Sequence, residues 1–386
     1  MSRFVYADNA ATTKISDKAL EAMLPWLKEG YGNPSSVYSI GRNSRRGIDT
    51  ARETVANAIG ALPEEIVFTG TGTEADNWVL RNIAEENKEK GRHIITSTIE
   101  HPAVGQTLKS LEEQGFRVTY LPVDEFGQIS VSAVEAAIEE DTILISIMFA
   151  NNEIGTILPI AQIGALAREK SILFHTDAVQ AVGHVPIDVH AMNIDFLVLS
   201  AHKFCGPKGV GALFVRKGLK LPSLLTGGSQ EKGKRAGTEN VAGIIGMATA
   251  LDHAVSNMEA NTKHVQALRD KLIKGMLEIP EVSLTGHPTN RLPGNASFVI
   301  SCIEGEALIL MMDAAGICAS SGSACSSGAL DPSHVLMAIG LSHEVAHGSV
   351  RLSLGEANTL EDVDYILEKM PPIIEKLRAM SPLWEA

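Results

Sequence analysis

A lysine just past an apolar run is the first residue here whose type and position suggest chemistry. Lys203 follows Phe196–Leu199, which has the length of a buried strand, and it precedes the Gly/Pro turn 206–209. Open α/β sheets bind ligands beyond the carboxyl ends of such strands. A lysine there can form a Schiff base with a carbonyl cofactor, and Ser200 and His202 beside it can donate hydrogen bonds to a phosphate. The alternative is a surface lysine in a turn.

A second candidate site is the small-residue turn Thr69–Asn77, which joins a short predicted strand to a long predicted helix. In such a turn the backbone N–H groups and the helix dipole face an anion, here around Gly72 and Thr73. A capped helix without a ligand explains the same residues equally well.

Three more predicted strands are followed by polar residues that suit a planar cofactor. An imidazole at His101 could stack on the cofactor and transfer protons, and Asp177 is the residue type that keeps a pyridine nitrogen protonated. Asn152 and Gln180 add amide donors. Structural roles remain open for each, since His101 precedes a helix at Pro102 and the others suit turns and caps. Together they favour a binding site, because they would meet at one edge of one sheet.

The segment Ala319–Gly328 places Cys325 among serines and glycines. None of these neighbours is large enough to bury it, so we expect an exposed thiol on a mobile loop, which suits a nucleophile that must approach a bound substrate. An incidental cysteine in a linker is the alternative. Cys318, beside Ile317 and Ala319, and Cys302, at the end of the run Ser297–Ser301, are predicted to be buried, whereas Cys205 has no clear placement.

The predicted strand Val350–Leu354 contains Arg351, which either extends from an edge strand or forks onto a carboxylate. Just before it, His343 and His347 complete an H-E-x-x-H pattern, as in zinc proteases. Gly348 and a strand follow immediately, so the long helix of a zinc protease is not expected there. A zinc hydrolase is therefore a minor alternative.

Composition limits the class of protein. The chain has 386 residues, which favours two domains, and 45% of them are hydrophobic with a mean hydropathy of +0.07. No apolar run can span a membrane and no signal peptide is apparent, so we expect a cytoplasmic protein. The net charge of −13 disfavours direct nucleic-acid binding. The four cysteines form no CxxC pair, which argues against a disulfide framework or a zinc ribbon.

Strands alternate with helices over about the first 215 residues, which predicts a mostly parallel sheet. The predicted strands cover 66–68, 94–96, 142–149, 172–176, 196–199, 210–215 and 350–354, and the predicted helices include 45–59, 160–170 and 261–277. A domain boundary is expected near 255–265.

With these residues considered together, the chain resembles the cysteine desulfurases of the NifS/IscS type, which belong to the class V aminotransferase family and use pyridoxal 5'-phosphate. The resemblance is nearly full length and highly specific. It covers Asp8–Thr13, Gly32–Ser36, Glu100–Val104, Ala150–Thr156, Phe174–Gln180, Arg235–Asn240, Ser321–Gly328 and Gly348–Leu354.

The resemblance implies an α/β protein with the type I fold of pyridoxal-phosphate-dependent transferases. A mostly parallel seven-stranded sheet is expected in a large cofactor-binding domain, residues 14–257. A smaller α+β domain would comprise 1–13 and 258–386 and would carry the Cys325 loop and Arg351.

The same resemblance implies a role for each candidate residue. Lys203 would hold the cofactor and shuttle a proton, Asp177 would pair with the ring nitrogen, and His101 would stack on the ring. Gln180 would bind the phenolic oxygen of the cofactor, and Asn152 would lie beside the ring. The phosphate would be held by Gly72, Thr73, Ser200, His202 and, from a second subunit, Thr238.

For the substrate, the resemblance implies that Arg351 clamps the carboxylate of L-cysteine, helped by Asn152 or Asn33. Cys325 would take the sulfur as a persulfide, leaving L-alanine, and would pass it to an iron–sulfur scaffold protein or another acceptor. Cys325 could also be an iron–sulfur ligand shared with such a scaffold, and the chain itself is expected to hold no resident metal. We expect a homodimer. Other hypotheses are a selenocysteine lyase of the same fold and a metal carrier built on the cysteines.

Overall fold

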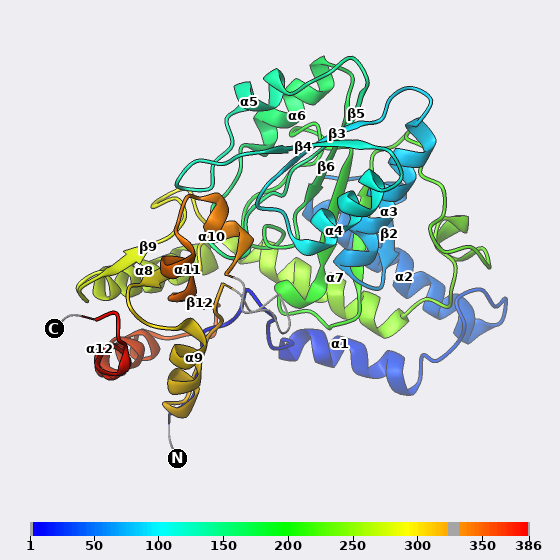
Figure 1. Cartoon of the computed structure of the whole chain (residues 1–386). Helices are drawn as coiled ribbons and strands as arrows, with labels where there is room; N and C mark the ends of the chain where they lie inside the picture. The colour runs from blue at the N-terminus through cyan, green and yellow to red at the C-terminus, as the bar shows by residue number, and fades with distance from the viewer. Residues whose placement is uncertain (1–2, 323–331, 385–386) are drawn as a thin grey trace.

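The computed structural model describes residues 3–322 and 332–384. In this part of the chain, seven strands form one large sheet in the order β2-β8-β7-β6-β5-β3-β4 (Figure 1). Neighbouring strands run parallel, except that β8 is antiparallel to both β2 and β7. The strands are β2 (Ile66–Thr69), β3 (His93–Ser97), β4 (Arg117–Leu121), β5 (Thr142–Ser146), β6 (Leu173–Asp177), β7 (Phe196–Ser200) and β8 (Gly211–Val215).

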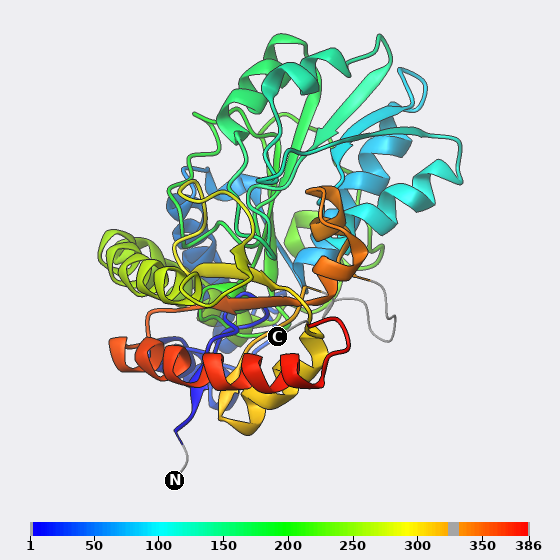
Figure 2. The same cartoon turned by 60° about the vertical axis from the view of Figure 1, so that its left-hand side comes forward.

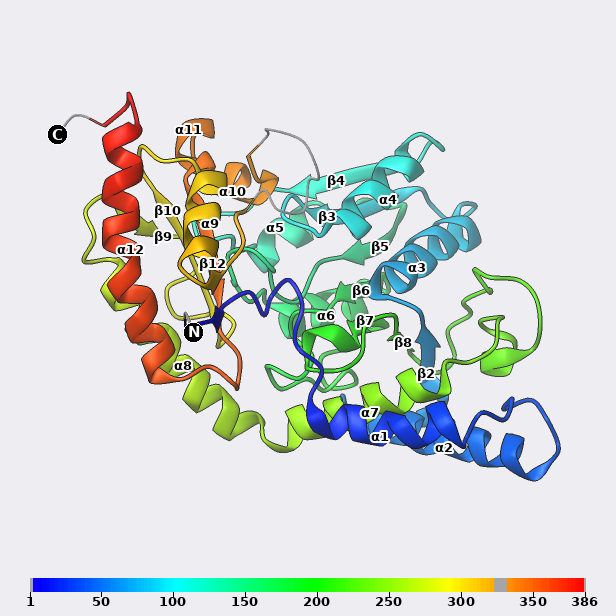
Figure 3. The same cartoon turned by 90° about the horizontal axis from the view of Figure 1, so that it is seen from below.

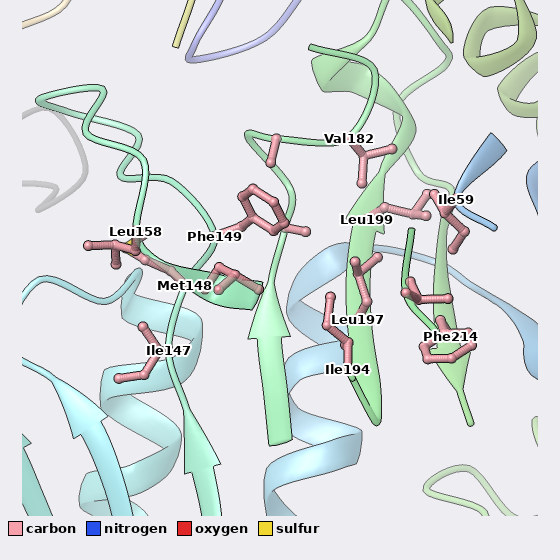
Figure 4. Close-up of a cluster of buried hydrophobic side chains, with 14 of the residues drawn as sticks. Ile59, Ile147, Met148, Phe149, Leu158, Val182, Ile194, Leu197, Leu199 and Phe214 are labelled. Atoms are coloured by element: carbon pink, nitrogen blue, oxygen red, sulfur yellow. The ribbon is translucent and has the colours of Figure 1, made fainter. Parts of the chain in front are cut away.

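The apolar runs of the central strands serve both faces of this sheet. Successive side chains of a strand point to opposite faces, so Val198 packs with α3 and α4 while Leu197 and Leu199 pack toward α2, α6 and α7. Figure 4 shows Leu197 and Leu199 grouped with Phe214 of β8 and Ile59 at the end of α2. Because both faces are buried, the sequences of these strands are continuously apolar rather than alternating between apolar and polar residues.

Helices begin where the sequence offers a cap. The hydroxyl of Thr71 accepts a hydrogen bond from Glu74 N at the start of α3, and the ring of His101 accepts one from Ala103 N at the start of α4. The helices of this part, of which α1 packs on α7 rather than on the sheet, are α1 (Asp17–Lys28), α2 (Ser39–Ala58), α3 (Gly72–Asn87), α4 (Pro102–Glu112), α5 (Val131–Ala136), α6 (Ile160–Glu169) and α7 (Val241–Ser256).

The C-terminal part has an apolar core of its own, which also includes Val5 and Ala7 from the N-terminus. Helices α8, α9 and α12 pack on a small antiparallel sheet of order β12-β10-β9, and α12 contacts both other helices (Figure 2). The elements are β1 (Val5–Tyr6), α8 (Met258–Met276), β9 (Val282–Leu284), β10 (Asn295–Ile300), α9 (Gly305–Ala314), β11 (Ile317–Cys318), α10 (His334–Ala338), α11 (His343–His347), β12 (Ser349–Ser353) and α12 (Leu360–Met380).

The two cores are joined by helices that meet at one residue. Asn257 ends α7 and begins α8, and Figure 3 shows the chain passing there from the large sheet to the C-terminal part. Residues of α10 and α11, such as Leu336 and Ala346, pack on the core of the large sheet although we predicted them in the small domain. The division at residue 257 itself stays a prediction.

The predicted α/β fold with a mostly parallel seven-stranded sheet is confirmed, with differences in detail. The run 142–149 is a strand only to Ser146, although Ile147 N and Phe149 N still donate hydrogen bonds to the carbonyls of His175 and Asp177 on β6. The buried positions predicted for Cys302 and Cys318 are wrong, since both are partly exposed. Cys302 lies beyond the end of β10 with φ of +64°, and Cys318 follows the buried Ile317 on a two-stranded sheet, so it faces the other way. No helix in the described ranges is long and apolar enough to cross a membrane.

A buried ion pair stabilises the edge of the large sheet. Arg52 of α2 donates two hydrogen bonds, of 2.7 and 2.8 Å, to the carboxylate of Glu231, which also accepts one from Phe68 N of β2. Their side chains are only 5% and 3% exposed, so loss of one charge leaves the other buried and unpaired.

We therefore expect Glu231→Gln to lower the free energy of unfolding by roughly 3 kcal/mol, measured by urea unfolding followed by far-UV circular dichroism. The control is Lys220→Ala, which removes a surface pair with Glu86 and should change stability by less than about 1 kcal/mol. Equal effects of the two substitutions would contradict a stabilising role for the buried pair.

Candidate active site

A cavity of about 640 Å³ opens at the carboxyl ends of the central parallel strands. This is where open α/β sheets bind ligands. Most of the predicted site residues line it, and they come from both cores: Gly72, Thr73, His101, Asn152, Asp177, Gln180, Ser200, His202, Lys203 and Arg351. The fold therefore brings together side chains that are up to 279 positions apart in the sequence, as for Gly72 and Arg351.

The amine of Lys203 is held at one wall of the cavity by the N-terminal segment. Lys203 lies in the short helix η2 (Ala201–Lys203) directly after β7. Its Nζ donates hydrogen bonds to Ala10 O at 2.6 Å and to Ala11 O at 2.8 Å, and the amide of Gln180 donates to the same Ala10 O. The backbone carbonyl of Lys203 lies 3.0 Å from His184 Nε2. Both ends of the lysine are thus fixed while its amine faces the cavity.

Asp177 and His101 form the second wall. Asp177 ends β6, is 7% exposed and accepts a hydrogen bond from Val179 N at 2.9 Å. Burial raises the pKa of Asp177, while His101 and Lys203 act in the opposite direction. Burial lowers the pKa of His101, whose Nδ1 accepts from Ala103 N, so the neutral ring carries its proton on Nε2.

The start of α3 also lines the cavity. Gly72 and Thr73 lie in the first turn of this helix, where N–H groups have no partner within the helix. A Cβ at Gly72 would come within 2.9 Å of Val179, so a larger residue would push into the wall. Burial and two nearby lysines lower the pKa of His202 to about 4, so its ring is neutral at pH 7. These groups suit an anion such as a phosphate.

Arg351 closes the opposite side from the middle of β12. It is 5% exposed and donates through Nη1 to Asn152 O at 2.9 Å and through Nη2 to Asp8 Oδ1 at 3.0 Å. Its Nε is buried without a hydrogen-bond partner in the structure. A buried guanidinium with an unused donor at a cavity wall suits a ligand carboxylate.

Three predicted site residues are not among the residues that line this cavity. Asn33 is exposed in the turn before α2, where its side chain accepts a hydrogen bond from Ser35 N, and Thr238 is exposed after Arg235. Both stay predictions, and that for Thr238 depends on a second subunit. Cys325 lies outside the described residues.

The geometry adds residues that the sequence analysis did not single out. Asp8 pairs with Arg351, and Asp76 and Lys208 line the cavity. Asp8 lies in the polar segment that resembles the family, and Asp76 lies one turn into the predicted anion-binding helix. For Asp8 and Asp76 these segments were the only indication in the sequence, because neither residue directly follows one of the predicted strands.

The H-E-x-x-H pattern forms a single helical turn, α11, capped by Ser342. The rings of His343 and His347 stand 4.6 Å apart at their centroids. Among the residues that the structure describes, no group of three or more His, Cys, Asp or Glu side chains could hold a metal ion. The described geometry therefore gives these histidines no third ligand of those types, and a zinc hydrolase is not supported.

Comparison with known proteins identifies the family. The model of the "Aminotransferase class-V" family matches residues 5–366, so the chain belongs to the class-V aminotransferase family. A protein of Methanosarcina thermophila named cysteine desulfurase IscS is 56% identical over 382 residues, which cover 99% of this chain and 95% of that protein. Within the family, the chain is thus similar to the cysteine desulfurases.

Solved structures agree with this assignment. A structure described as a NifS-like protein has a TM-score of 0.92 and 40% sequence identity, and the match covers 97% of this chain and all of the other. A second, described as SspA in complex with cysteine, has a TM-score of 0.82 and 37% identity over 92% of this chain and all of the other.

A buried carboxyl beside His101 should make stability depend on pH. Glu100 is 4% exposed, and its Oε1 accepts hydrogen bonds from Ser97 Oγ and Met148 N while Oε2 has no partner. Burial raises the pKa of Glu100 from 4.5 to about 8. Between these values the folded protein binds a proton that the unfolded chain has lost, so stability falls as pH rises from 5 to 8.

Glu100→Gln removes this titration and should lose less stability over the same range. Relative to the wild type, the melting temperature of the variant should therefore rise by several degrees between pH 5 and pH 8. Glu153, whose pKa is also raised, to about 7, titrates in both proteins and cancels in the difference. Parallel curves would contradict a protonated Glu100.

Proposed function

We propose that this protein is a cysteine desulfurase that uses pyridoxal 5'-phosphate, converts L-cysteine to L-alanine and takes up the sulfur on Cys325. The observation that carries the proposal is the meeting of Lys203, Asp177 and Arg351 on one cavity. The three provide an amine for a carbonyl cofactor, an acid for a pyridine nitrogen and a cation for an amino-acid carboxylate. The similarity to proteins named cysteine desulfurase selects this activity within the family.

The residues present fit this cofactor. Lys203 would attach it, Asp177 would pair with its ring nitrogen, Gln180 would bind its phenolic oxygen and His101 would stack on its ring. Gly72, Thr73, Ser200 and His202 would hold the phosphate at the start of α3. Bound pyridoxal phosphate supplies an electron sink for negative charge that develops on the substrate.

The chain's own groups would then bind and position the amino acid. The guanidinium of Arg351 is already fixed by Asp8 and by the carbonyl of Asn152, so it can bind the substrate carboxylate without losing much side-chain freedom. Its unpartnered Nε would gain an acceptor. The Lys203 amine, once released, would take the proton from the substrate Cα, and neutral His101 would hold or pass on a proton from Nε2.

Sulfur transfer would fall to Cys325. Its thiolate forms an S–S bond to the substrate sulfur while the Cβ–S bond breaks with its electron pair on the carbon side. Protonation of carbon completes L-alanine, so L-cysteine and one thiol give L-alanine and one persulfide. Ser320 lines the cavity, and Cys325 follows only five residues later. That spacing supports the assignment.

The persulfide sulfur would pass to an acceptor such as an iron–sulfur scaffold protein. In the complex with that scaffold, Cys325 would also be a shared iron–sulfur ligand. We place the enzyme in the cytoplasm. A selenocysteine lyase is the second candidate, because selenocysteine carries the same carboxylate and amino group as cysteine, so the same side chains would bind it.

Replacing Cys325 tests the nucleophile. We expect Cys325→Ser to lower alanine formation from L-cysteine by several orders of magnitude, since the thiolate takes part in the bond that breaks. The visible absorbance of the bound cofactor should persist, because Cys325 has no predicted part in holding it. Cys302→Ser is the matched control and should retain full activity, since Cys302 contacts Leu383 and does not line the cavity.

If Cys325→Ser kept full turnover with L-cysteine, the proposed sulfur transfer would be wrong. Retained cleavage of selenocysteine with lost cleavage of cysteine would show that the substrate preference depends on this thiol. A protein that binds no pyridoxal phosphate at all would contradict the whole proposal.

We also propose a homodimer in which Thr238 completes the phosphate site of the other subunit. Thr238 is exposed and absent from the cavity of its own chain. The segment around Asn33 exposes apolar side chains as well, with Tyr31 76% and Val37 85% exposed, as a subunit contact requires. Closed two-fold dimers are the commonest assemblies.

Mixed dimers test this sharing of the site. Lys203→Ala and Thr238→Ala are each expected to be weakly active or inactive alone. Co-refolded in equal amounts, they should regain about a quarter of wild-type activity, because half of the dimers then contain one complete site. If the mixture only averaged the two single variants, Thr238 would not act across subunits.

A further inference from the structure

A second aspartate lies in the same cavity as Asp177. Asp76 belongs to the first turns of α3, is 1% exposed and lines the cavity, yet none of the proposed catalytic or binding roles uses it. A buried carboxyl group usually has a charge partner, a hydrogen-bond partner or a functional role. Its surroundings therefore need an explanation.

Asp76 ends a buried row of polar side chains that crosses from α3 to the strands beneath. Its Oδ1 lies 3.4 Å from His175 Nε2 on β6, and His175 Nδ1 lies 2.9 Å from Ser146 Oγ on β5. His175 is fully buried and Ser146 is 1% exposed. Although they lie 3.4 Å apart, neither Asp76 Oδ1 nor His175 Nε2 has a hydrogen-bond partner in the structure, so a proton shared between these two buried atoms would satisfy both.

The order Ser–His–Asp resembles a hydrolytic triad, but the burial excludes that role. A nucleophilic serine must reach a substrate, and Ser146 lies within the central strand β5, under the sheet-covering layers. The row opens to the cavity only at Asp76, which is the one member that lines it. The row of polar side chains can therefore affect a ligand in the cavity only through Asp76.

The charged groups around the two aspartates differ. Burial raises the pKa of Asp76 well above the usual range, and Asp177 on β6 and Glu100 after β3, when ionised, raise it further. Burial lowers the pKa of His175 to about 3, so its ring is neutral and gives Asp76 no positive charge. Asp177, in contrast, has His101 and Lys203 nearby and the N–H of Val179 on its Oδ1.

We propose that Asp76 is a positioning residue for Asp177: it remains a neutral carboxylic acid, held by the neutral His175–Ser146 pair, so that Asp177 alone carries the negative charge beside the cofactor's ring nitrogen. Two neighbouring buried carboxyl groups cannot both ionise cheaply, and the group with the weaker support keeps the proton. Asp76 donates that proton to His175 Nε2, and His175 then donates from Nδ1 to Ser146 Oγ. This inference rests on the proposed function.

Infrared difference spectroscopy tests the protonation state without any catalytic turnover. At pH 7, the wild-type minus Asp76→Asn spectrum should contain the C=O band of a protonated carboxyl group, in protein with and without cofactor. The wild-type minus Glu100→Gln spectrum identifies the band of the other buried acid. A carboxylate signal in place of the C=O band at Asp76 would overturn the proposal.

Cofactor affinity tests the positioning role. Asp76→Ala removes the carboxyl group 3.4 Å from His175 Nε2 and should weaken pyridoxal phosphate binding to apoprotein about tenfold, measured by equilibrium dialysis. Asp76→Asn keeps a neutral donor at the same place and should recover most of that loss, whereas Asp177→Asn should not recover binding. If Asp76→Asn bound the cofactor as weakly as Asp177→Asn, a negative charge at Asp76 would be required and the proposal would be wrong.

These measurements separate the inference from the function on which it rests. Failure of the wild-type protein to bind pyridoxal phosphate would contradict the proposed function. The infrared spectrum of the apoprotein would still report whether Asp76 is protonated, and circular dichroism of both Asp76 variants would show that they are folded.

Discussion

The parallel direction of β5, β6 and β7 is the constraint on which the site depends. Because these strands run the same way, their carboxyl ends and the turns that follow lie along one edge of the sheet, which brings Asn152, Asp177 and Lys203 to one cavity. The apolar side chains that bury the strands on both faces fix this edge. Polar groups at the edge can then be rigid without being part of the core.

The N-terminal segment connects this edge to the second core. Asn9 N donates to Ser353 O and Ser353 N donates to Ala7 O, so the segment runs beside β12. The carbonyls of Ala10 and Ala11 accept from Lys203, and Asp8 pairs with Arg351. One short stretch of chain thus positions both the amine at one wall and the guanidinium at the other.

The sequence predicted the large sheet and nearly half of the residues that line the cavity, because most of those predicted residues follow strands, where a turn or cap is visible in the sequence. Asp76 escaped this reasoning, since its role depends on a contact with His175 on another element. Cys302 and Cys318 were placed wrongly because one or two apolar neighbours do not determine which way a side chain faces. Asn33 and Thr238 do not line the cavity, and the role proposed for Thr238 involves a second subunit, which no periodicity within one sequence reveals.

The pairing of Asp8 with Arg351 joins residues separated by 343 positions in the chain. A nascent chain therefore emerges from the ribosome with its lysine and aspartates long before the arginine has been made. The large sheet can form early, because N-terminal units fold first during synthesis. A complete binding cavity, however, can arise only late in translation. A ligand that needs both walls of the cavity can therefore bind only after nearly all of the chain described here has been synthesised.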